Sequence, residues 1–391
     1  MRWPAVWNGL LRHLLVLTVL AFVGCRTPPD DQLTDENRPV ATAGLELSHL
    51  LSGEAEGFAR ATEPRLFVFP EDLGSHPDFR TEWWYLTGNL TTSSGRRFGY
   101  QFTLFRNALA AEQTPRRSRW ATRQVYMAHL ALTDVDNNRF FAFERFARGA
   151  AGLAGVELDP FRAWLEDWEL GSDDSSPAFR LKASAGEIAL DLELATSKPV
   201  VLQGEAGLSR KGSEPGNASY YYAFTRLATS GQIRLEGREL EVRGNSWLDR
   251  EWSTSALEPT QSGWDWFALQ LDDGTDLMVY QMRRDGGRPD PVSSGSRIGA
   301  DGTRFALSWS DFQLEVLDWW TSPETGVRYP SGWRLRLPGD QLDLQIEPLL
   351  RDQELNLSVL YWEGAVRVEG TRGSTPISGR GYVELTGYAV P

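Results

Sequence analysis

The sequence predicts an all-β protein with two domains. Aromatic residues and glycine are abundant, short runs alternate apolar with polar residues, and turn-forming residues recur between these runs. A chain of 391 residues is too long for one ordinary hydrophobic core, which indicates two domains. We expect a first domain over residues 61–253 and a second over residues 254–391.

The N-terminus has the features of a bacterial lipoprotein signal. Arg2 and Arg12 precede an apolar stretch over residues 14–24, and the only cysteine, Cys25, follows directly. We therefore expect residues 1–24 to be a signal peptide and Cys25 to be lipidated. The alternatives are an ordinary signal peptide or an uncleaved anchor helix. A flexible tether is expected over residues 25–60.

These features predict a place in the bacterial cell envelope. Acyl chains on Cys25 would hold the protein on a membrane surface, and Arg26 in place of aspartate favours the outer membrane, facing the periplasm. No later apolar run is long enough to span a membrane. The net charge of -13 and a pI near 5.0 argue against nucleic acid as a partner and against electrostatic binding to anionic lipid.

The first domain is expected to be a series of antiparallel strands. Residues 81–90 and 97–106 form a hairpin around Ser94-Gly95, and residues 125–134 pair with 139–146 through the turn Asp136-Asn137-Asn138. Further strands are expected at 164–170, 179–185, 187–195, 220–227, 231–235 and 240–243.

The second domain begins with a hairpin of residues 264–271 and 276–283. Asp272-Asp273-Gly274 forms its turn because Asp-Gly readily adopts positive φ. Regularly spaced strands without intervening helices predict sandwiches or up-and-down barrels, and a barrel of about eight strands can enclose a small apolar ligand. The remaining strands are expected at 304–309, 314–320, 332–337, 342–348, 361–370 and 378–386.

Three clusters set tryptophan beside carboxyl groups, at residues 82–85, 247–252 and 264–266. Burial among indole rings raises the pKa of a carboxyl group, which keeps an acid protonated near neutral pH. In an extended chain Trp247, Asp249 and Glu251 share one face. The clusters are therefore candidate site residues, and the alternative is a set of hydrogen-bond anchors in an aromatic core.

Four motifs follow one another along the chain: His76-Pro77-Asp78-x-x-x-Glu82-Trp83-Trp84-Tyr85, Ala128-His129-x-x-x-Thr133-Asp134, Gly244-x-x-Trp247-x-Asp249-Arg250-Glu251-Trp252 and Gly263-Trp264-Asp265-Trp266. In this order and spacing they resemble the AttH/CrtC family, which includes predicted secreted hydrolases and carotenoid 1,2-hydratases (hydroxyneurosporene synthases). The resemblance covers residues 65–391. It implies two lipocalin-like (calycin) β-barrel domains with a site at or near their junction.

The hydratase branch of this family implies protonation of an alkene and capture of the cation by water. That chemistry needs an acid kept neutral, an apolar channel and aromatic faces. Asp249 is the preferred acid and Glu82 the second, with Glu251 beside Asp249. The alternative is that Asp249 and Glu251 pair with Arg250 or another arginine and lock the domain junction. The expected aromatic walls are Trp84, Tyr85, Trp247, Trp252, Trp264, Trp266 and Tyr280.

His129 is a further candidate, as a base or proton relay, and the alternative is a buried histidine bonded to a backbone carbonyl. Histidines and cysteine are too few and too scattered to suggest a metal site. We expect no cofactor, because no phosphate-binding loop or dinucleotide fingerprint is present. No Gly-x-Ser-x-Gly elbow supports a serine nucleophile.

The sequence thus favours a lipid-anchored enzyme of the hydratase or hydrolase kind that acts on a hydrophobic terpenoid-, carotenoid- or lipid-like molecule. A second hypothesis is a non-catalytic lipocalin-like carrier of an apolar ligand at the membrane. A third is a carbohydrate-active protein, because carboxylate pairs and tryptophans also suit sugars. The family resemblance adds ABC-type export components as possible partners.

Overall fold

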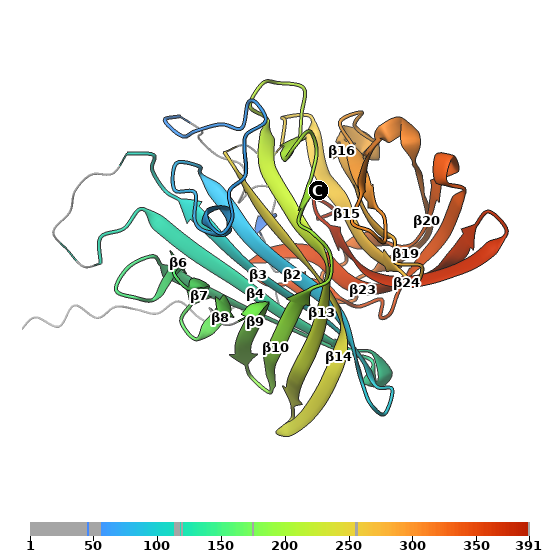
Figure 1. The fold of residues 1–391 in the computed structure, drawn as a ribbon, viewed down its shortest axis with the longest axis horizontal. Helices are drawn as coiled ribbons and strands as arrows, with labels where there is room; N and C mark the ends of the chain where they lie inside the picture. The colour runs from blue at the N-terminus through green and yellow to red at the C-terminus, as the bar shows by residue number, and fades with distance from the viewer. Residues whose placement is uncertain are drawn as a thin grey trace, which may run out of the picture. The chain divides into compact units, whose positions relative to one another are not determined.

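The fold consists almost entirely of β-strands, which confirms the predicted all-β class (Figure 1). The structure is a computed structural model that describes residues 45–46, 56–112, 118, 120–173, 176–254 and 257–389. No helix in these ranges has the length and apolar character to cross a membrane. Residues Thr42–Pro391 group as a single compact unit, and the division into domains at residues 253 and 254 stays a prediction.

The first sheet is antiparallel, with the strand order β5-β4-β3-β2-β14-β13-β10-β9-β8-β7-β6. Two short strands, β11 (Val201–Leu202) and β12 (Leu208–Arg210), pair with β13. The main strands are β2 (Thr81–Thr92), β3 (Arg97–Ala108), β4 (Gln124–Asp134), β5 (Arg139–Arg148), β6 (Ala154–Leu158), β7 (Phe161–Leu165), β8 (Trp168–Asp173), β9 (Ser176–Ala185), β10 (Ile188–Thr196), β13 (Ala218–Leu235) and β14 (Arg238–Ser253).

The second sheet has the order β18-β17-β16-β15-β24-β23-β21-β20-β19, and β1 (Leu45–Glu46) and β22 (Glu354–Asn356) pair with β23. Its main strands are β15 (Gln261–Leu271), β16 (Asp276–Arg284), β17 (Ser294–Ile298), β18 (Arg304–Ser308), β19 (Gln313–Thr321), β20 (Arg328–Leu337), β21 (Leu342–Pro348), β23 (Val359–Arg372) and β24 (Thr375–Leu385). The short 3-10 helices are η1 (Glu71–Leu73), η2 (Val135–Asn137), η3 (Asp285–Gly287), η4 (Trp309–Asp311) and η5 (Pro338–Asp340).

Some strands are longer than the sequence predicted. The segments expected at 220–227 and 231–235 form the single strand β13, with a register shift between Phe224 and Leu227. β14 runs on through the acidic and aromatic motif to Ser253. Ala228, Thr229 and Ser230, which separate the two predicted segments, pair with both β10 and β14, so the strand continues.

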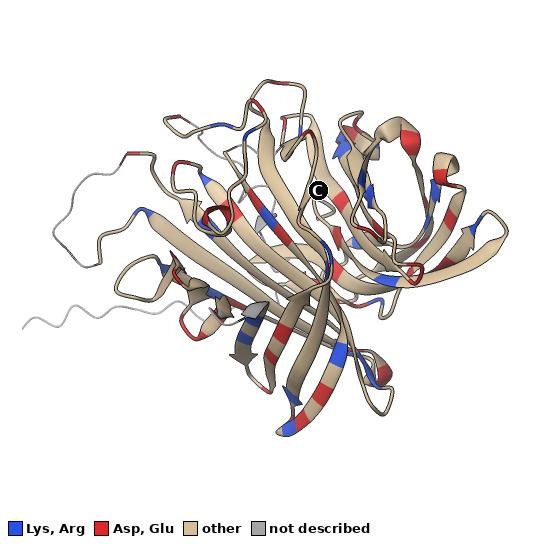
Figure 2. Cartoon of the chain, in the orientation of Figure 1, with Lys and Arg blue, Asp and Glu red and all other residues tan. Residues whose placement is uncertain are grey.

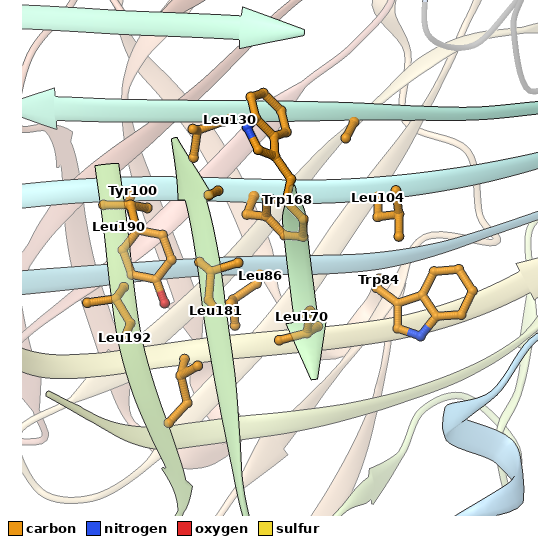
Figure 3. Packing of buried hydrophobic residues seen from close by; sticks show 14 of the residues in the cluster. Trp84, Leu86, Tyr100, Leu104, Leu130, Trp168, Leu170, Leu181, Leu190 and Leu192 are labelled. Atoms are coloured by element: carbon orange, nitrogen blue, oxygen red, sulfur yellow. The ribbon is translucent and has the colours of Figure 1, made fainter. Parts of the chain in front are cut away.

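Each sheet curls around its own apolar core, as the lipocalin-like prediction requires. Alternate residues of β2, such as Trp84 and Leu86, point into the first core, which also contains Trp168 of β8 (Figure 3). Phe267, Trp333 and their neighbours fill the second core in the same way. Burying each large apolar side chain contributes about 1.5–3 kcal/mol, so these two cores supply most of the stabilisation.

The outer faces of the two sheets pack against each other along β2 and β24, β3 and β23, and β13 and β15 (Figure 1). The contact is close, because a Cβ atom added at Gly99 would lie 2.5 Å from the Cβ of Ala365. The side-chain amide of Asn89 donates to the backbone carbonyl of Gly381 across the junction, at 3.0 Å. The strands that meet at this junction therefore present one face to a barrel core and the other to the opposite sheet.

Acidic and basic positions are mixed along the strands of both sheets (Figure 2). The most deeply buried group of charges lies on the inner face of the first sheet. The carboxylate of Glu82, 0% exposed, forms ion pairs with Arg106 and Arg250. The Arg250 guanidinium also lies 3.9 Å from the ring centroid of Trp84 and donates to the backbone carbonyl of Gly74. These contacts fasten the segment before β2 to the first sheet.

We predict that Arg250→Met will lower the free energy of unfolding by about 3–5 kcal/mol, because it removes one of the two cations that compensate buried Glu82. Chemical denaturation followed by tryptophan fluorescence will measure this change. Arg180→Met is the matched control, because its partner Asp191 is exposed and such pairs contribute about 0–1 kcal/mol. Equal effects of the two substitutions would contradict a fastening role for Arg250.

Candidate functional site

A pocket of about 770 Å³, including the space open to solvent at its mouth, lies where the two sheets pack together. Its walls combine aromatic rings with three carboxyl groups and one lysine. The lining residues are Trp83, Tyr85, Phe105, Lys211, Tyr221, Asp249, Glu251, Ser253, Trp264, Trp266, Tyr280, Met282 and Glu384.

The register of the strands explains why these side chains meet. In the first sheet Tyr85 of β2 lies opposite Asp249 of β14, and the next outward-facing pair is Trp83 with Glu251. In the second sheet Trp266 of β15 has partners on both of its neighbouring strands, and both partners also line the pocket. Because side chains alternate along a strand, each strand places every second residue in the pocket.

Of the pocket acids, Asp249 has the most strongly raised pKa. It is 4% exposed, and its two oxygens accept hydrogen bonds from Tyr221 Oη at 2.7 Å and Trp247 Nε1 at 2.6 Å. Burial raises its pKa to about 8, although both hydrogen bonds favour the charged form. Asp249 therefore carries a proton at neutral pH, as a general acid must.

Glu251 lies two residues along the same face but has a cation as its partner. Its Oε1 is 2.9 Å from Lys211 Nζ and accepts a hydrogen bond from Ser219. Lys211 Nζ also lies over the ring of Tyr280, 4.7 Å from the centroid. Burial opposes the charged form of Lys211, yet the Glu251 carboxylate gives a net increase in its pKa. This part of the pocket thus holds a neutralised ion pair.

Glu384 of β24 enters the pocket from the second sheet. Its Oε1 accepts a hydrogen bond from Trp264 Nε1 at 2.8 Å, which orients the carboxyl group. Burial raises the pKa of Glu384 to about 7. The pocket therefore contains two acids with pKa values near neutrality, and they are carried by different sheets.

The structure brings together six of the site residues predicted from the sequence. Trp247 lies directly behind the pocket wall and donates its indole hydrogen to Asp249. The shared face predicted for Trp247, Asp249 and Glu251 is present in β14. The six predicted residues that line the pocket are Asp249, Glu251, Tyr85, Trp264, Trp266 and Tyr280.

Glu82, Trp84 and Trp252 lie on the opposite face of the first sheet, away from Asp249. Glu82 was the second candidate acid, but its two arginine partners favour the charged form. Burial alone would raise its pKa, and the guanidinium groups of Arg250 and Arg106 instead hold it well below its usual range. Trp84 is in the first core, and Trp252 is stacked on His76 with ring centroids 3.6 Å apart. These three residues contribute to the fold rather than to the pocket wall.

His129 lies in the junction but not in the pocket wall. Its Nδ1 is 2.8 Å from Tyr361 Oη, so its partner is a hydroxyl group and not the backbone carbonyl considered above. Burial lowers the pKa of His129 to about 3, which keeps the imidazole neutral. Its Nε2 has no hydrogen-bond partner among the described residues.

Sequence reasoning missed several pocket residues. Glu384 stands between Val383 and Leu385 in a predicted strand. A single acid in such an apolar run could have marked it as a candidate site residue. Lys211 lies in a loop with no distinguishing pattern, and only the fold brings it to Glu251. The pocket residues without an assigned role were Trp83, Phe105, Lys211, Ser253, Met282 and Glu384, and Tyr221 was expected mainly to pack.

Within the ranges that the structure describes, no three or more His, Cys, Asp or Glu side chains are arranged to hold a metal ion. Cys25, the predicted lipidation site, lies outside those ranges.

Comparison with known families identifies the protein's relatives. The family described as AttH-like matches residues 60–388, which is most of the chain. The chain belongs to the AttH-like family. A crystal structure described as a putative AttH from Nitrosomonas europaea is 36% identical, with a TM-score of 0.76, and the match covers 85% of this chain and 99% of that one. No curated protein matches this AttH-like chain.

More distant structures share the fold of this AttH-like protein. Kievitone hydratase from Nectria haematococca is 15% identical, with a TM-score of 0.63, over 84% of this chain and 98% of that one. CghA is 10% identical, with a TM-score of 0.51, over 89% of this chain and 99% of that one. At these identities the likeness establishes the fold alone.

The raised pKa of Asp249 predicts a pH-dependent stability for this AttH-like protein. Between pH 3.8 and about pH 8 the folded protein retains a proton on Asp249 that the unfolded chain releases, so the free energy of unfolding falls as pH rises. Asp249→Asn removes this contribution. Relative to the wild type, the variant should gain stability steadily from about pH 4 to about pH 8.

Urea denaturation at a series of pH values will measure the difference. Asp191→Asn is the control, because Arg180 lowers the pKa of exposed Asp191 and its carboxylate is ionised in both states above about pH 5. A stability curve for Asp249→Asn that runs parallel to the wild-type curve would show that Asp249 is ionised in the folded protein.

Proposed function

We propose that this AttH-like protein is a hydratase of the bacterial cell envelope that adds water to a carbon–carbon double bond of a hydrophobic terpenoid- or lipid-like molecule. One observation carries the proposal: Asp249 retains a proton near neutral pH inside an aromatic pocket. The fold that the chain shares with kievitone hydratase supports the same class of chemistry.

In the proposed reaction Asp249 donates its proton to one alkene carbon, and the π electrons form the new C–H bond. The other carbon becomes a cation, which the aromatic ring of Trp266 stabilises. A water molecule then forms the C–O bond and releases one proton, so the net change is the addition of one water. General acid catalysis of this kind contributes about 10²–10⁴-fold to the rate.

The largely aromatic wall of the pocket favours an apolar substrate over a sugar. A sugar carries many hydroxyl groups, and each would lose its water partners against aromatic rings that offer no hydrogen bond in return. Asp249 and Glu251 lie buried between the two sheets in this apolar setting. The same acid could also activate an ester or a lactone, so an ester of a long-chain alcohol belongs in the assay.

We predict that Asp249→Asn will lower turnover by at least about 100-fold, because an amide N–H is far too weak an acid to protonate an alkene. The assay incubates the protein with kievitone, geraniol and squalene in ¹⁸O-labelled water and follows the gain of one labelled water by mass spectrometry. For the wild type, kcat/KM should fall above about pH 8, as Asp249 loses its proton.

The control Asp191→Asn changes an exposed carboxylate and should turn over at the wild-type rate. Thermal unfolding separates catalysis from structure: loss of turnover by a folded Asp249→Asn variant supports the acid role, and an unfolded variant would make Asp249 a structural lock. If an apolar compound co-purifies with the wild type and is returned unaltered, and no test alkene or ester reacts, the protein is a carrier.

The proposed location at the envelope rests on the N-terminal sequence. We predict that radiolabelled palmitate will be incorporated into the full chain in a bacterial host and that Cys25→Ser will abolish the label. Fractionation should place the labelled protein with outer membranes. Label that persists in the Cys25→Ser variant would contradict the predicted anchor. If ABC-type export components co-purify with the protein from these membranes, they are its partners.

A further inference from the structure

Two carboxyl groups face each other at the back of the pocket. Glu363 of β23 and Glu384 of β24 are directly opposed in the antiparallel register. Directly opposed side chains have Cβ atoms about 4.5–5.5 Å apart. Glu384 lines the pocket, whereas Glu363 lies behind it and is 1% exposed. Two ionised carboxylates cannot both be stable at this spacing in a buried setting.

The surroundings of Glu363 differ from those of three other buried acids in the protein. Glu82, Asp265 and Asp276 each have an arginine or lysine partner. Neither carboxyl oxygen of Glu363 has a well-oriented hydrogen-bond partner among the described residues, and its polar neighbours besides Glu384 include the hydroxyl groups of Tyr85, Tyr361 and Tyr382. Glu363 therefore meets no charge that would compensate its ionised form.

The groups around the pair set which of the two carboxyls ionises. Glu384 has the Trp264 indole as a donor and Lys211 as a nearby cation, and both favour its charged form. Glu363 has neither. Other titratable groups surround the pair. From the first sheet and its loops these are Tyr85 of β2, His129 of β4, Glu144 of β5, Asp249 and Glu251 of β14, and Lys211 in the loop before β13. From the second sheet they are Tyr361 of β23 and Tyr382 of β24.

We infer that Glu363 and Glu384 hold one proton between them, that Glu363 keeps it, and that ionised Glu384 is the base that accepts a proton from the water that adds to the substrate. The assignment of Glu384 rests on the proposed hydratase function. Glu363 is a positioning residue, because its retained proton confines the negative charge of the pair to the member that faces the pocket.

The proton balance of this scheme closes. Asp249 gives its proton to the alkene carbon from the first sheet, and the attacking water gives a proton to Glu384 on the second sheet. The proton then leaves Glu384 through water in the pocket and returns to Asp249. The alkene gains one hydrogen and one hydroxyl group, and each carboxyl group regains its starting state.

The shared proton is tested without any substrate. In the Asp249→Asn background, infrared spectra at about pH 8 should show the C=O stretching band of a protonated carboxyl group, because buried glutamates can retain a proton at that pH. Addition of Glu363→Gln should remove the band, and addition of Glu384→Gln should leave it. Glu369→Gln is the matched control, because Glu369 is exposed on the same strand β23.

No band in the Asp249→Asn protein, or a band that survives Glu363→Gln, overturns the shared-proton assignment. These results do not depend on turnover. The infrared result can therefore support the shared proton when no alkene is hydrated, and it can contradict the shared proton when hydration is observed.

The base is tested by turnover of whichever of kievitone, geraniol and squalene the wild type hydrates. Glu384→Gln should lower kcat by at least about 100-fold, with KM little changed. The Glu369→Gln control should match the wild type, because Glu369 is exposed and lies outside the pocket. Wild-type turnover by Glu384→Gln overturns the assignment. If none of the alkenes reacts, both the proposed hydratase function and the assignment of Glu384 as its base are rejected.

Discussion

Packing of the two sheets through their outer faces removes water from side chains that would otherwise be on a barrel surface. The strands in this contact carry three pocket carboxyl groups, and desolvation disfavours the charge of each one. The cost of desolvating these carboxyl groups is met in two ways. Glu251 is compensated by Lys211, whereas Asp249 has only neutral hydrogen-bond donors and so retains a proton. The chemistry of the pocket follows from how the two sheets meet.

The two faces of β14 show how the surroundings decide the state of a carboxyl group. Glu82 pairs with Arg250 on the inner face, and the two guanidinium groups beside it lower its pKa. Asp249, one residue from Arg250 along the strand, faces the junction, and burial raises its pKa. Both acids belong to the motifs on which the sequence resemblance rests, yet one fastens the fold and the other faces the pocket. A shared motif therefore does not imply a shared role.

Local patterns were sufficient for much of the fold and part of the site. Alternation along β14 placed Trp247, Asp249 and Glu251 on one face, and Asp273-Gly274 predicted the β15–β16 hairpin, where Gly274 has φ of +84°. The same patterns could not tell which face of β2 meets the second sheet, so Glu82 and Trp84 were grouped with Asp249. Glu384 and Lys211 reach the pocket through contacts between distant segments, which no local pattern encodes.

The junction also bears on how such a protein can change over evolutionary time. Along β24, Val383 and Leu385 fill the second barrel, whereas Tyr382 and Glu384 face the first sheet. Successive residues thus serve different purposes, one maintaining the scaffold and the next defining what is bound. Exchanges at alternate positions can alter the shape of the guest that fits while both barrel interiors remain intact. This separation would allow relatives with the same architecture to diverge widely in the molecules they handle.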